Sequence, residues 1–234
     1  MVCADWRNQK LYTNNTVMII ALEQLFDVNL IAHRALVEKM QEPWEIIPRL
    51  KEYIARTIQA GNHGRVVGNT YIDEQVQIGE GTVVEHGACI LGPTIIGRNC
   101  VVRAGAYIRA FSLIEDGCVI GHASEIKNSW LMQGAHAAHF NYVGDSVIGR
   151  NVNLAAGALC ANVRLDPHTV SIKHNGERID TGLKKFGALV GDDSKIGCNV
   201  VLNPGTLIGK NSKIYPALSI SGMHQSSSKI SVKG

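Results

Sequence analysis

An aliphatic residue recurs at every sixth position along the middle of the chain. The unbroken series comprises Val66, Ile72, Ile78, Val84, Ile90, Ile96, Val102, Ile108, Ile114, Ile120 and Ile126, and the same spacing returns later in the sequence. A period of six fits neither a helix nor an ordinary strand. It fits a three-sided coil in which each short strand sends one aliphatic side chain inward and glycine permits the corner that follows. The pattern therefore predicts a parallel β-helix with turns of about 18 residues.

Two interruptions of this register predict loops that leave the coil. Ile126 to Ile148 is longer than one turn by four positions, so we expect a short loop at about 132–140. The second interruption covers 163–185 and contains Asn175-Gly176 between two alternating runs, which predicts a β-hairpin. Loops on a rigid coil often carry function.

The chain before the coil has a helical period. One stripe carries Trp44, Ile47, Leu50, Ile54 and Ile58, with Pro43 near its start and Gly61 just past its end. We expect residues 1–61 to contain two or three helices and to form a cap packed on the first turn, because the open end of a solenoid needs a cover. A partner-binding role for these helices stays open. The coil would then occupy 62–222, followed by a polar tail at 223–234.

Composition narrows the functional class. The net charge of the 234 residues is +3 without a basic block, so neither nucleic acid nor a membrane surface is indicated as a partner. The six cysteines are scattered without a C-x-x-C pair, which favours reduced thiols. The apolar run Val17–Phe26 is too short to span a bilayer and lacks signal-peptide flanks. We therefore expect a cytoplasmic protein.

A longer motif lies at the first interruption. The chain reads His139-Phe-Asn-Tyr-Val-Gly-Asp145 and then Ile148-Gly-Arg-Asn-Val-Asn-Leu-Ala-Ala-Gly157. This segment resembles the acetyltransferase domain of bifunctional UDP-N-acetylglucosamine pyrophosphorylase/glucosamine-1-phosphate N-acetyltransferases, whose motif is His-x-x-Tyr-x-Gly-Asp followed by Ile-Gly-x-Asn-Val-Asn-x-Gly-Ala-Gly. Two other stretches, Glu125-Ile-Lys-Asn-Ser129 and 184–193, match neighbouring parts of that domain. The sequence around the hairpin resembles the archaeal-type sugar-1-phosphate enzymes more than the commonest bacterial ones. The resemblance covers about 66–214 and omits the nucleotidyltransferase half.

The resemblance implies a left-handed coil of hexapeptide repeats that assembles as a homotrimer, with sites in the grooves between subunits. It implies acetyl transfer from acetyl-CoA, the co-substrate, to an amino-sugar phosphate such as glucosamine-1-phosphate. This reaction needs a base that takes a proton from the amine and a donor for the oxyanion. The motif gives the first role to His139, with Glu125 to orient it, and the second to the backbone N–H of Ala156.

Further site residues follow from the same match. Those that would hold the sugar phosphate are Arg109, Lys127, Tyr142, Asn153 and Lys185, since cations, hydroxyls and amides suit phosphate oxygens. Those that would line the acetyl-CoA groove are Ala156, Cys198 and Pro216. Arg109 and Lys127 are separated by one full turn of the expected coil, which would stack them on the same face.

Other readings stay open. The chain has Arg109-Ala-Phe111 where the family has Arg-Pro-Gly, and such departures leave the identity of the sugar undecided. The alternatives are another hexapeptide-repeat acyltransferase, acting with acyl carrier protein or on oxygen, and a non-catalytic scaffold. The γ-type carbonic anhydrases share the fold, but their close zinc-binding histidines are spaced more widely than His136 and His139. We therefore expect no metal.

Overall fold

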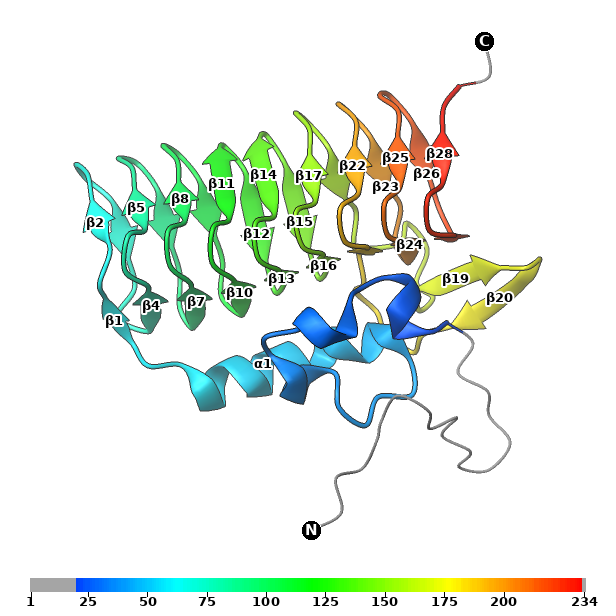
Figure 1. Ribbon diagram of the computed structural model, residues 1–234, viewed down its shortest axis with the longest axis horizontal. Coiled ribbons are helices and arrows are strands. Elements are labelled where there is room, and N and C mark those ends of the chain that lie inside the picture. Colours follow the sequence, from blue (N-terminus) through cyan, green and yellow to red (C-terminus); the bar gives the residue numbers. More distant parts are fainter. Residues whose placement is uncertain (1–19, 233–234) are drawn as a thin grey trace.

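The computed structural model describes residues 20–232, most of which form a left-handed parallel β-helix (Figure 1). Its three faces are three parallel sheets, named here sheets A, B and C in the order in which each turn visits them. Strands in one sheet come from successive turns, so residues about one turn apart become neighbours. The predicted fold class is confirmed.

The strands are short, as expected for a coil with a corner every few residues. Sheet A contains β1 (Gly61–Asn62), β4 (Val76–Ile78), β7 (Thr94–Ile96), β10 (Ser112–Ile114), β13 (Trp130–Leu131), β16 (Val147–Ile148), β21 (Ala188–Val190), β24 (Thr206–Ile208) and β27 (Met223–His224). Sheet B contains β2 (Arg65–Val66), β5 (Val83–Val84), β8 (Val101–Val102), β11 (Val119–His122), β14 (His136–His139), β17 (Asn153–Leu154), β22 (Lys195–Ile196), β25 (Lys213–Ile214) and β28 (Lys229–Ile230). Sheet C contains β3 (Tyr71–Ile72), β6 (Cys89–Ile90), β9 (Tyr107–Ile108), β12 (Glu125–Lys127), β15 (Tyr142–Gly144), β18 (Leu159–Cys160), β23 (Val201–Leu202) and β26 (Ser219–Ile220).

The aliphatic residues of the six-residue register form the core inside the coil. Ile78, Ile90 and Ile96 are fully buried there, together with most of the series. Ile78 pairs with Ile96, which lies one full turn later in the register. The register read from the sequence is therefore the packing register of the protein.

The loop expected at 132–140 is absent, and that prediction is wrong. Residues 136–139 form β14, a regular strand of sheet B. The inward residue after Ile126 is Leu131 instead of the next position of the register. Ile126 accordingly pairs with Val143, one position short of a regular turn. Two corners, the one after Ile126 and the one after Val143, are each shorter by a residue, so the register shifts and no residues are left over for a loop.

The hairpin predicted within 163–185 is confirmed. Its strands are β19 (Ser171–His174) and β20 (Glu177–Asp180), and Asn175 and Gly176 both have positive φ, as the tight turn requires. The hairpin does not project freely. Val170 and Ile172 are fully buried in a second apolar core outside the coil. This arrangement fixes the insertion to the outer side of sheet A.

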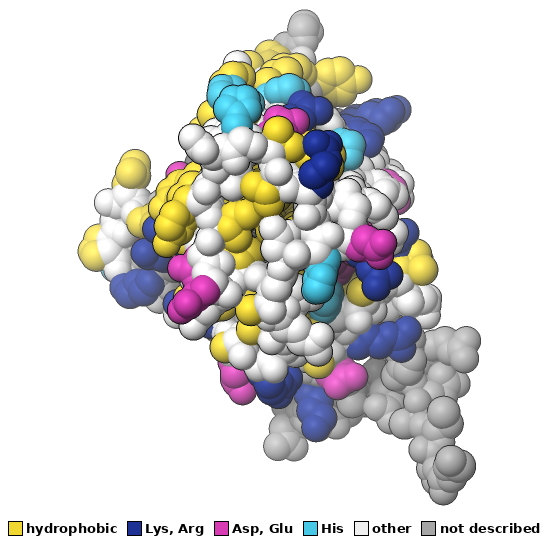
Figure 2. Space-filling model, turned by 90° about the vertical axis from the view of Figure 1, so that its left-hand side faces the viewer, with side chains coloured by type: hydrophobic (Ala, Val, Ile, Leu, Met, Phe, Trp, Pro, Cys, Tyr) yellow, Lys and Arg dark blue, Asp and Glu magenta, His cyan; other side chains and the backbone are white. Residues whose placement is uncertain are grey.

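The N-terminal helices do not cover the first turn, so the predicted placement of the cap is wrong. They are η2 (Leu22–Gln24), η3 (Val28–Leu30), η4 (Arg34–Leu36), η5 (Pro43–Glu45) and α1 (Ile46–Thr57). They lie along the outer face of sheet A (Figure 1), while apolar side chains remain visible at the centre of the first-turn end (Figure 2). The reason is that sheet A is apolar on its outer face as well. The outward residues packed against the helices include Ile95, Leu113, Trp130, Val147, Leu189 and Leu207.

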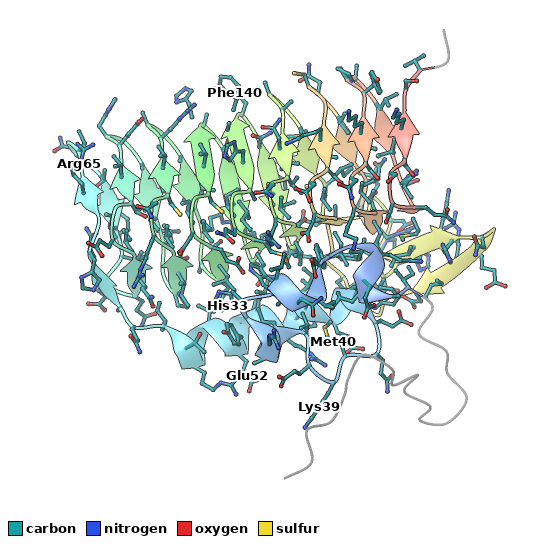
Figure 3. All side chains as sticks on the ribbon, viewed as in Figure 1. His33, Lys39, Met40, Glu52, Arg65 and Phe140 are labelled. Atoms are coloured by element: carbon teal, nitrogen blue, oxygen red, sulfur yellow. The ribbon has the colours of Figure 1, made fainter. Side chains whose placement is uncertain are left out.

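A polar cluster joins the helices to the coil. His33 lies on the side of the helical segment that faces the coil (Figure 3). Its Nδ1 atom lies 2.8 Å from the Tyr53 hydroxyl, and its ring meets that of Trp130 edge to face. Trp130 Nε1 donates to Glu115 at 2.9 Å. Burial lowers the pKa of His33 and raises that of Glu115. A neutral imidazole therefore bridges the helical segment and the solenoid.

The coil also extends further than the sequence predicted. Residues 223–224 and 229–230 form β27 and β28, so most of the expected polar tail is a final turn. This turn is shorter than a regular one, since Ile214 pairs with Ile230 instead of Val232. Positions 1–19 of the expected cap and 233–234 of the expected tail lie outside the described residues. Within residues 20–232, no helix is long and apolar enough to cross a membrane.

Candidate active site

His139 lies where sheet B turns into sheet C. It ends β14, and the chain turns the corner through Phe140 and Asn141 into β15. The Asn141 side chain is buried and accepts a hydrogen bond from the backbone N–H of His139 at 3.0 Å. It also donates to the carbonyl of Ala155, one turn later, at 2.8 Å. Asn141 therefore fixes the backbone at His139, whose own side chain is exposed.

The residues predicted for catalysis and for the acetyl-CoA groove share this edge, named here the B–C edge. The Gly157 N–H donates to the His139 carbonyl at 3.0 Å, which places the adjoining Ala156 beside His139. The Ala156 carbonyl accepts from Asn199, and the Cys198 carbonyl accepts from Ala217, at 2.9 and 2.8 Å. His139, Ala156, Cys198 and Pro216 thus follow one another over four consecutive turns.

The Ala156 N–H is available to a ligand. Among the residues that the structure describes, its nitrogen donates to no backbone or side-chain acceptor, whereas the amides of Ala155, Gly157 and Ala158 all do. Ala156 is half-buried at the corner after β17. A free N–H next to an exposed imidazole is the pair of groups that acyl transfer requires.

The predicted cations lie on the other side of sheet C, where it turns into sheet A, named here the C–A edge. Tyr107 pairs with Glu125 and Ile108 with Ile126, so Arg109 and Lys127 are stacked as expected. Arg109 Nη1 donates to Glu125 Oε1 at 2.8 Å, and this bond raises the pKa of the guanidinium. Arg109 and Glu125 are 40% and 32% exposed, so solvent screens this pair.

Lys127 is paired differently. Its Nζ donates to Asp145 Oδ2 at 3.0 Å, and the Asp145 side chain is only 7% exposed. Asp145 and Asn162 were given no role by the sequence, although Asp145 ends the quoted motif. The Tyr142 hydroxyl donates to Asn162 Oδ1 at 3.3 Å, and burial is the main cause that raises the pKa of Tyr142. These side chains form one polar group on the C–A edge.

The remaining predicted residues are more scattered. Lys185 is exposed, and the next residue, Phe186, donates its N–H to the Asn162 carbonyl at 3.0 Å, which places Lys185 near the C–A edge. Asn153 lies on sheet B between His136 and Lys195. A single chain therefore divides the predicted acceptor-binding residues between two faces.

Glu125, predicted to orient His139, is bonded to a different residue in one subunit. Its carboxylate is bonded to Arg109, and within residues 20–232 no hydrogen bond joins it to His139. Glu125 begins β12 of sheet C, and His139 ends β14 of sheet B. In one subunit, the Glu125 carboxylate is bonded to Arg109, and its orienting role toward His139 stays a prediction.

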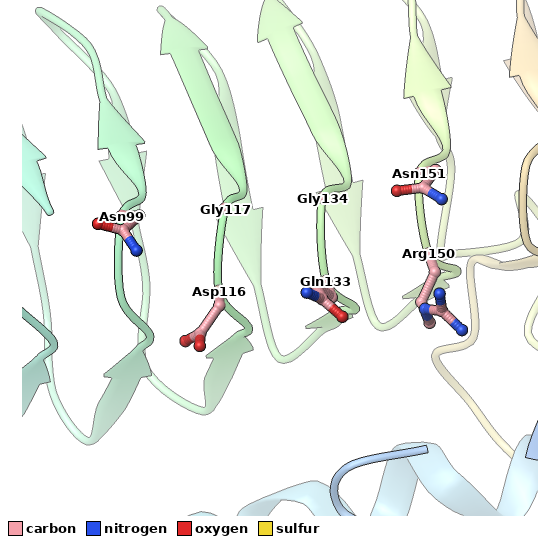
Figure 4. Close-up of a pocket in the computed structure, with 7 residues that line it drawn as sticks. All are labelled: Asn99, Asp116, Gly117, Gln133, Gly134, Arg150 and Asn151. Atoms are coloured by element: carbon pink, nitrogen blue, oxygen red, sulfur yellow. The ribbon is translucent and has the colours of Figure 1, made fainter. Parts of the chain in front are cut away.

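A pocket lies apart from these two edges. It has a volume of about 360 Å³ and follows the corners between sheets A and B (Figure 4). Its polar lining residues are Asn99, Asp116, Gln133, Arg150 and Asn151. None of the predicted site residues belongs to it. Within the described residues, no group of three His, Cys, Asp or Glu side chains could hold a metal ion.

Comparisons with known proteins agree with the motif. A family model described as the GMPPB C-terminal domain matches residues 90–176. The chain is 37% identical over 175 residues to a bifunctional sugar-1-phosphate nucleotidylyltransferase/acetyltransferase of Sulfurisphaera tokodaii, covering 75% of this chain and 44% of that protein. It is 36% identical over 170 residues to a putative uncharacterized acetyltransferase, YaiX, of Escherichia coli, covering 71% of this chain and 74% of that protein. The chain thus spans less than half the length of the bifunctional relative.

Among solved structures, UDP-N-acetylglucosamine acyltransferase from Campylobacter jejuni is 14% identical to this chain, with a TM-score of 0.42. The match covers 70% of this chain and 72% of that one.

Proposed function

Because this chain belongs to the family of acetyltransferase domains found in bifunctional sugar-1-phosphate nucleotidylyltransferase/acetyltransferases, we propose that it transfers the acetyl group of acetyl-CoA to the amine of an amino-sugar phosphate. Glucosamine-1-phosphate is the proposed acceptor, from the resemblance of the motif at 139–157. The observation that carries the proposal is the position of His139 next to the unbonded N–H of Ala156.

The chemistry follows from these two groups. The acceptor amine attacks the thioester carbonyl carbon, and His139 takes a proton from the nitrogen as the C–N bond forms. The carbonyl oxygen becomes negative, and the Ala156 N–H donates to it. The C–S bond then breaks, and the sulfur of coenzyme A leaves with the proton held by the imidazolium. The products are the N-acetylated sugar phosphate and free coenzyme A.

The B–C edge supports a site for the long co-substrate. Ala156, Cys198 and Pro216 are half-buried or exposed on successive corners, so an extended molecule lying along the edge meets all three. Its thioester end would lie at Ala156, beside His139. The acceptor phosphate would be held by Arg109, Lys127, Tyr142, Asn153 and Lys185.

A homotrimer brings the divided groups together. Sheet A is covered by the N-terminal helices, and sheet B exposes Lys195, Lys213 and Lys229. Sheet C exposes Tyr71 and Tyr107, which are 57% and 38% exposed. A threefold axis facing sheet C would cover these rings and place the B–C edge of each subunit against the C–A edge of its neighbour. His139 of one subunit would then meet Lys127 and Tyr142 of the next.

The test is His139→Ala with acetyl-CoA and glucosamine-1-phosphate. We expect kcat to fall about 10²–10⁴-fold, the usual contribution of a positioned base, with little change in the KM for acetyl-CoA. His86→Ala is the matched control, because His86 is also exposed on the B–C edge but lies three turns earlier. Near-normal turnover of His139→Ala would refute the assignment.

Mixing variants tests the trimer. His139→Ala and Lys127→Ala subunits, refolded together, should recover part of the activity, because some interfaces then carry an intact His139 and an intact Lys127. If the mixture stays as inactive as the separate variants, the site does not lie between subunits.

A further inference from the structure

Asp145 is a buried residue at a corner of the coil. It follows β15 at the C–A edge with φ of 47°, in the left-handed region. Its backbone N–H donates to the Lys127 carbonyl, and its carbonyl accepts from Gly187, each at 2.9 Å. The residue is therefore tied to the turn before it and to the segment after the hairpin. Its carboxylate is held inside the corner and is not free to move into solvent.

Three side chains donate to this carboxylate. Lys127 Nζ donates to Oδ2 at 3.0 Å, and Asn128 Nδ2 donates to Oδ1 at 2.7 Å. Asn162 Nδ2 also donates to Oδ2 in a close contact, and the side-chain oxygen Oδ1 of Asn162 accepts from the Tyr142 hydroxyl. One buried carboxylate thus connects two proposed acceptor-binding groups, the Lys127 ammonium and the Tyr142 hydroxyl.

The geometry has a direct consequence for the acceptor. Lys127 has a flexible stem, and its ammonium finds a defined place only because a carboxylate holds it. The Asn162 amide is oriented in the same way, since its nitrogen faces Asp145 and its oxygen faces Tyr142. Without Asp145, the ammonium and both asparagine amides would point at one another or at solvent.

We propose that Asp145 is a positioning residue for the acceptor site, which fixes the Lys127 ammonium and, through Asn162, the Tyr142 hydroxyl so that both meet the anionic group of one sugar phosphate. This proposal rests on the proposed function. It concerns a residue that touches no substrate and acts through its two neighbours.

Charge and position predict opposite results for Asp145→Asn. Removing a negative charge near a phosphate should tighten binding if charge is all that matters. Removing the acceptor that orients Lys127 and Asn162 should weaken binding if position matters. We expect the KM for glucosamine-1-phosphate to rise about tenfold or more, the effect of losing a hydrogen bond to a charged group, while the KM for acetyl-CoA changes less than about twofold.

Asp192→Asn is the matched control. Asp192 is also a buried corner carboxylate, and it accepts from the backbone N–H groups of Asp27 and Arg150 at 2.8 and 2.7 Å. It lies at the edge between sheets A and B, away from the site. We expect this variant to lower the melting temperature without raising the acceptor KM. If Asp192→Asn and Asp145→Asn raise that KM equally, Asp145 is only structural.

A double-mutant cycle tests the path through Asn162. Asp145→Asn and Tyr142→Phe should be non-additive in acceptor KM, because both disturb the same hydroxyl. Asn162→Ala keeps the Lys127–Asp145 pair, so it should raise the KM less than Asp145→Asn, and it serves if Asp145→Asn does not fold. Additive effects, or a lower KM for Asp145→Asn, would overturn the proposal.

The two proposals fail in different ways. Calorimetry of glucosamine-1-phosphate binding needs no turnover. If the wild type binds the sugar phosphate but transfers no acetyl group, and Asp145→Asn weakens binding, the positioning role stands and the acetyl transfer is wrong. If the wild type is active and Asp145→Asn binds normally, the positioning role is wrong and the function stands. A wild type that neither binds nor acetylates overturns both.

Discussion

Leu113 and Ile114 are neighbours on β10, and both are fully buried, but they belong to different cores. Side chains alternate along a strand, so Ile114 points into the coil and Leu113 points outward under the N-terminal helices. Replacing each by alanine removes a similar apolar volume from the same turn. The pair therefore separates the stability of the coil from the docking of the helices.

The expected cost is about 2–5 kcal/mol for either substitution, the usual range for a buried leucine or isoleucine changed to alanine. Leu113→Ala should place that cost on the docked segment 20–58. The segment also has backbone anchors, since the Gln24 and Leu25 carbonyls accept from Lys210 and Asp192 at 3.0 and 2.9 Å. It should therefore open more often and not detach permanently. Ile114→Ala should place the cost on the turns that stack above and below it.

Hydrogen exchange measures both effects. Leu113→Ala should speed exchange in α1 by about thirtyfold or more, which corresponds to the lower end of that range, and leave the sheet amides protected. Ile114→Ala should speed exchange of the sheet amides, including Glu115 N–H, which donates to Leu131 across turns. If both variants affect α1 and the sheets equally, the two cores unfold as one and the reasoning is wrong.

Two further predictions concern the outer core. Deleting 167–180 should lower the melting temperature while the coil's circular dichroism persists, because it removes Val170 and Ile172 from that core; an unchanged melting temperature would show that the hairpin contributes nothing there. Burial lowers the pKa of His33 in the folded state, so the unfolded state binds more protons just below the ordinary value of about 6.5. The free energy of unfolding of the wild type should therefore fall relative to that of His33→Gln as pH drops from 7 to below 6, and parallel pH profiles of stability for the two proteins would contradict this. The raised pKa of Glu115 changes stability in the opposite direction, but Glu115 is present in both proteins, so comparing them reduces its contribution to the difference.

The fold was predictable where one physical constraint repeats. Every strand of the three coil sheets must bury a side chain inside the coil, and the six-residue spacing records that requirement directly. The hairpin was predictable for a similar reason, since Asn175 and Gly176 adopt positive φ at little cost.

The position of the helices was missed although the sequence contains a signal for it. In most turns of sheet A the residue before the inward one is also apolar and buried, as in Leu113-Ile114, Trp130-Leu131 and Leu207-Ile208. Sheet B has half-buried valine at this position in its early turns and exposed lysine in its later ones, as in Lys195-Ile196 and Lys213-Ile214. A face that is apolar on both sides must be covered by something. The amphipathic helix α1 and the short helices before it are what cover it.

The candidate site was predictable only as far as the turns of the coil are regular. Arithmetic with regular turns placed Arg109 above Lys127, and the structure agrees. The same arithmetic cannot find the partner of Lys127, because the turn that follows is one position shorter and pairs Lys127 with Gly144. The shortened corner puts Asp145 next to Asn128, where its carboxylate accepts from both Asn128 and Lys127. The first of the two shortened corners that misled the prediction of a loop is therefore also the reason that a buried carboxylate lies under the proposed phosphate site.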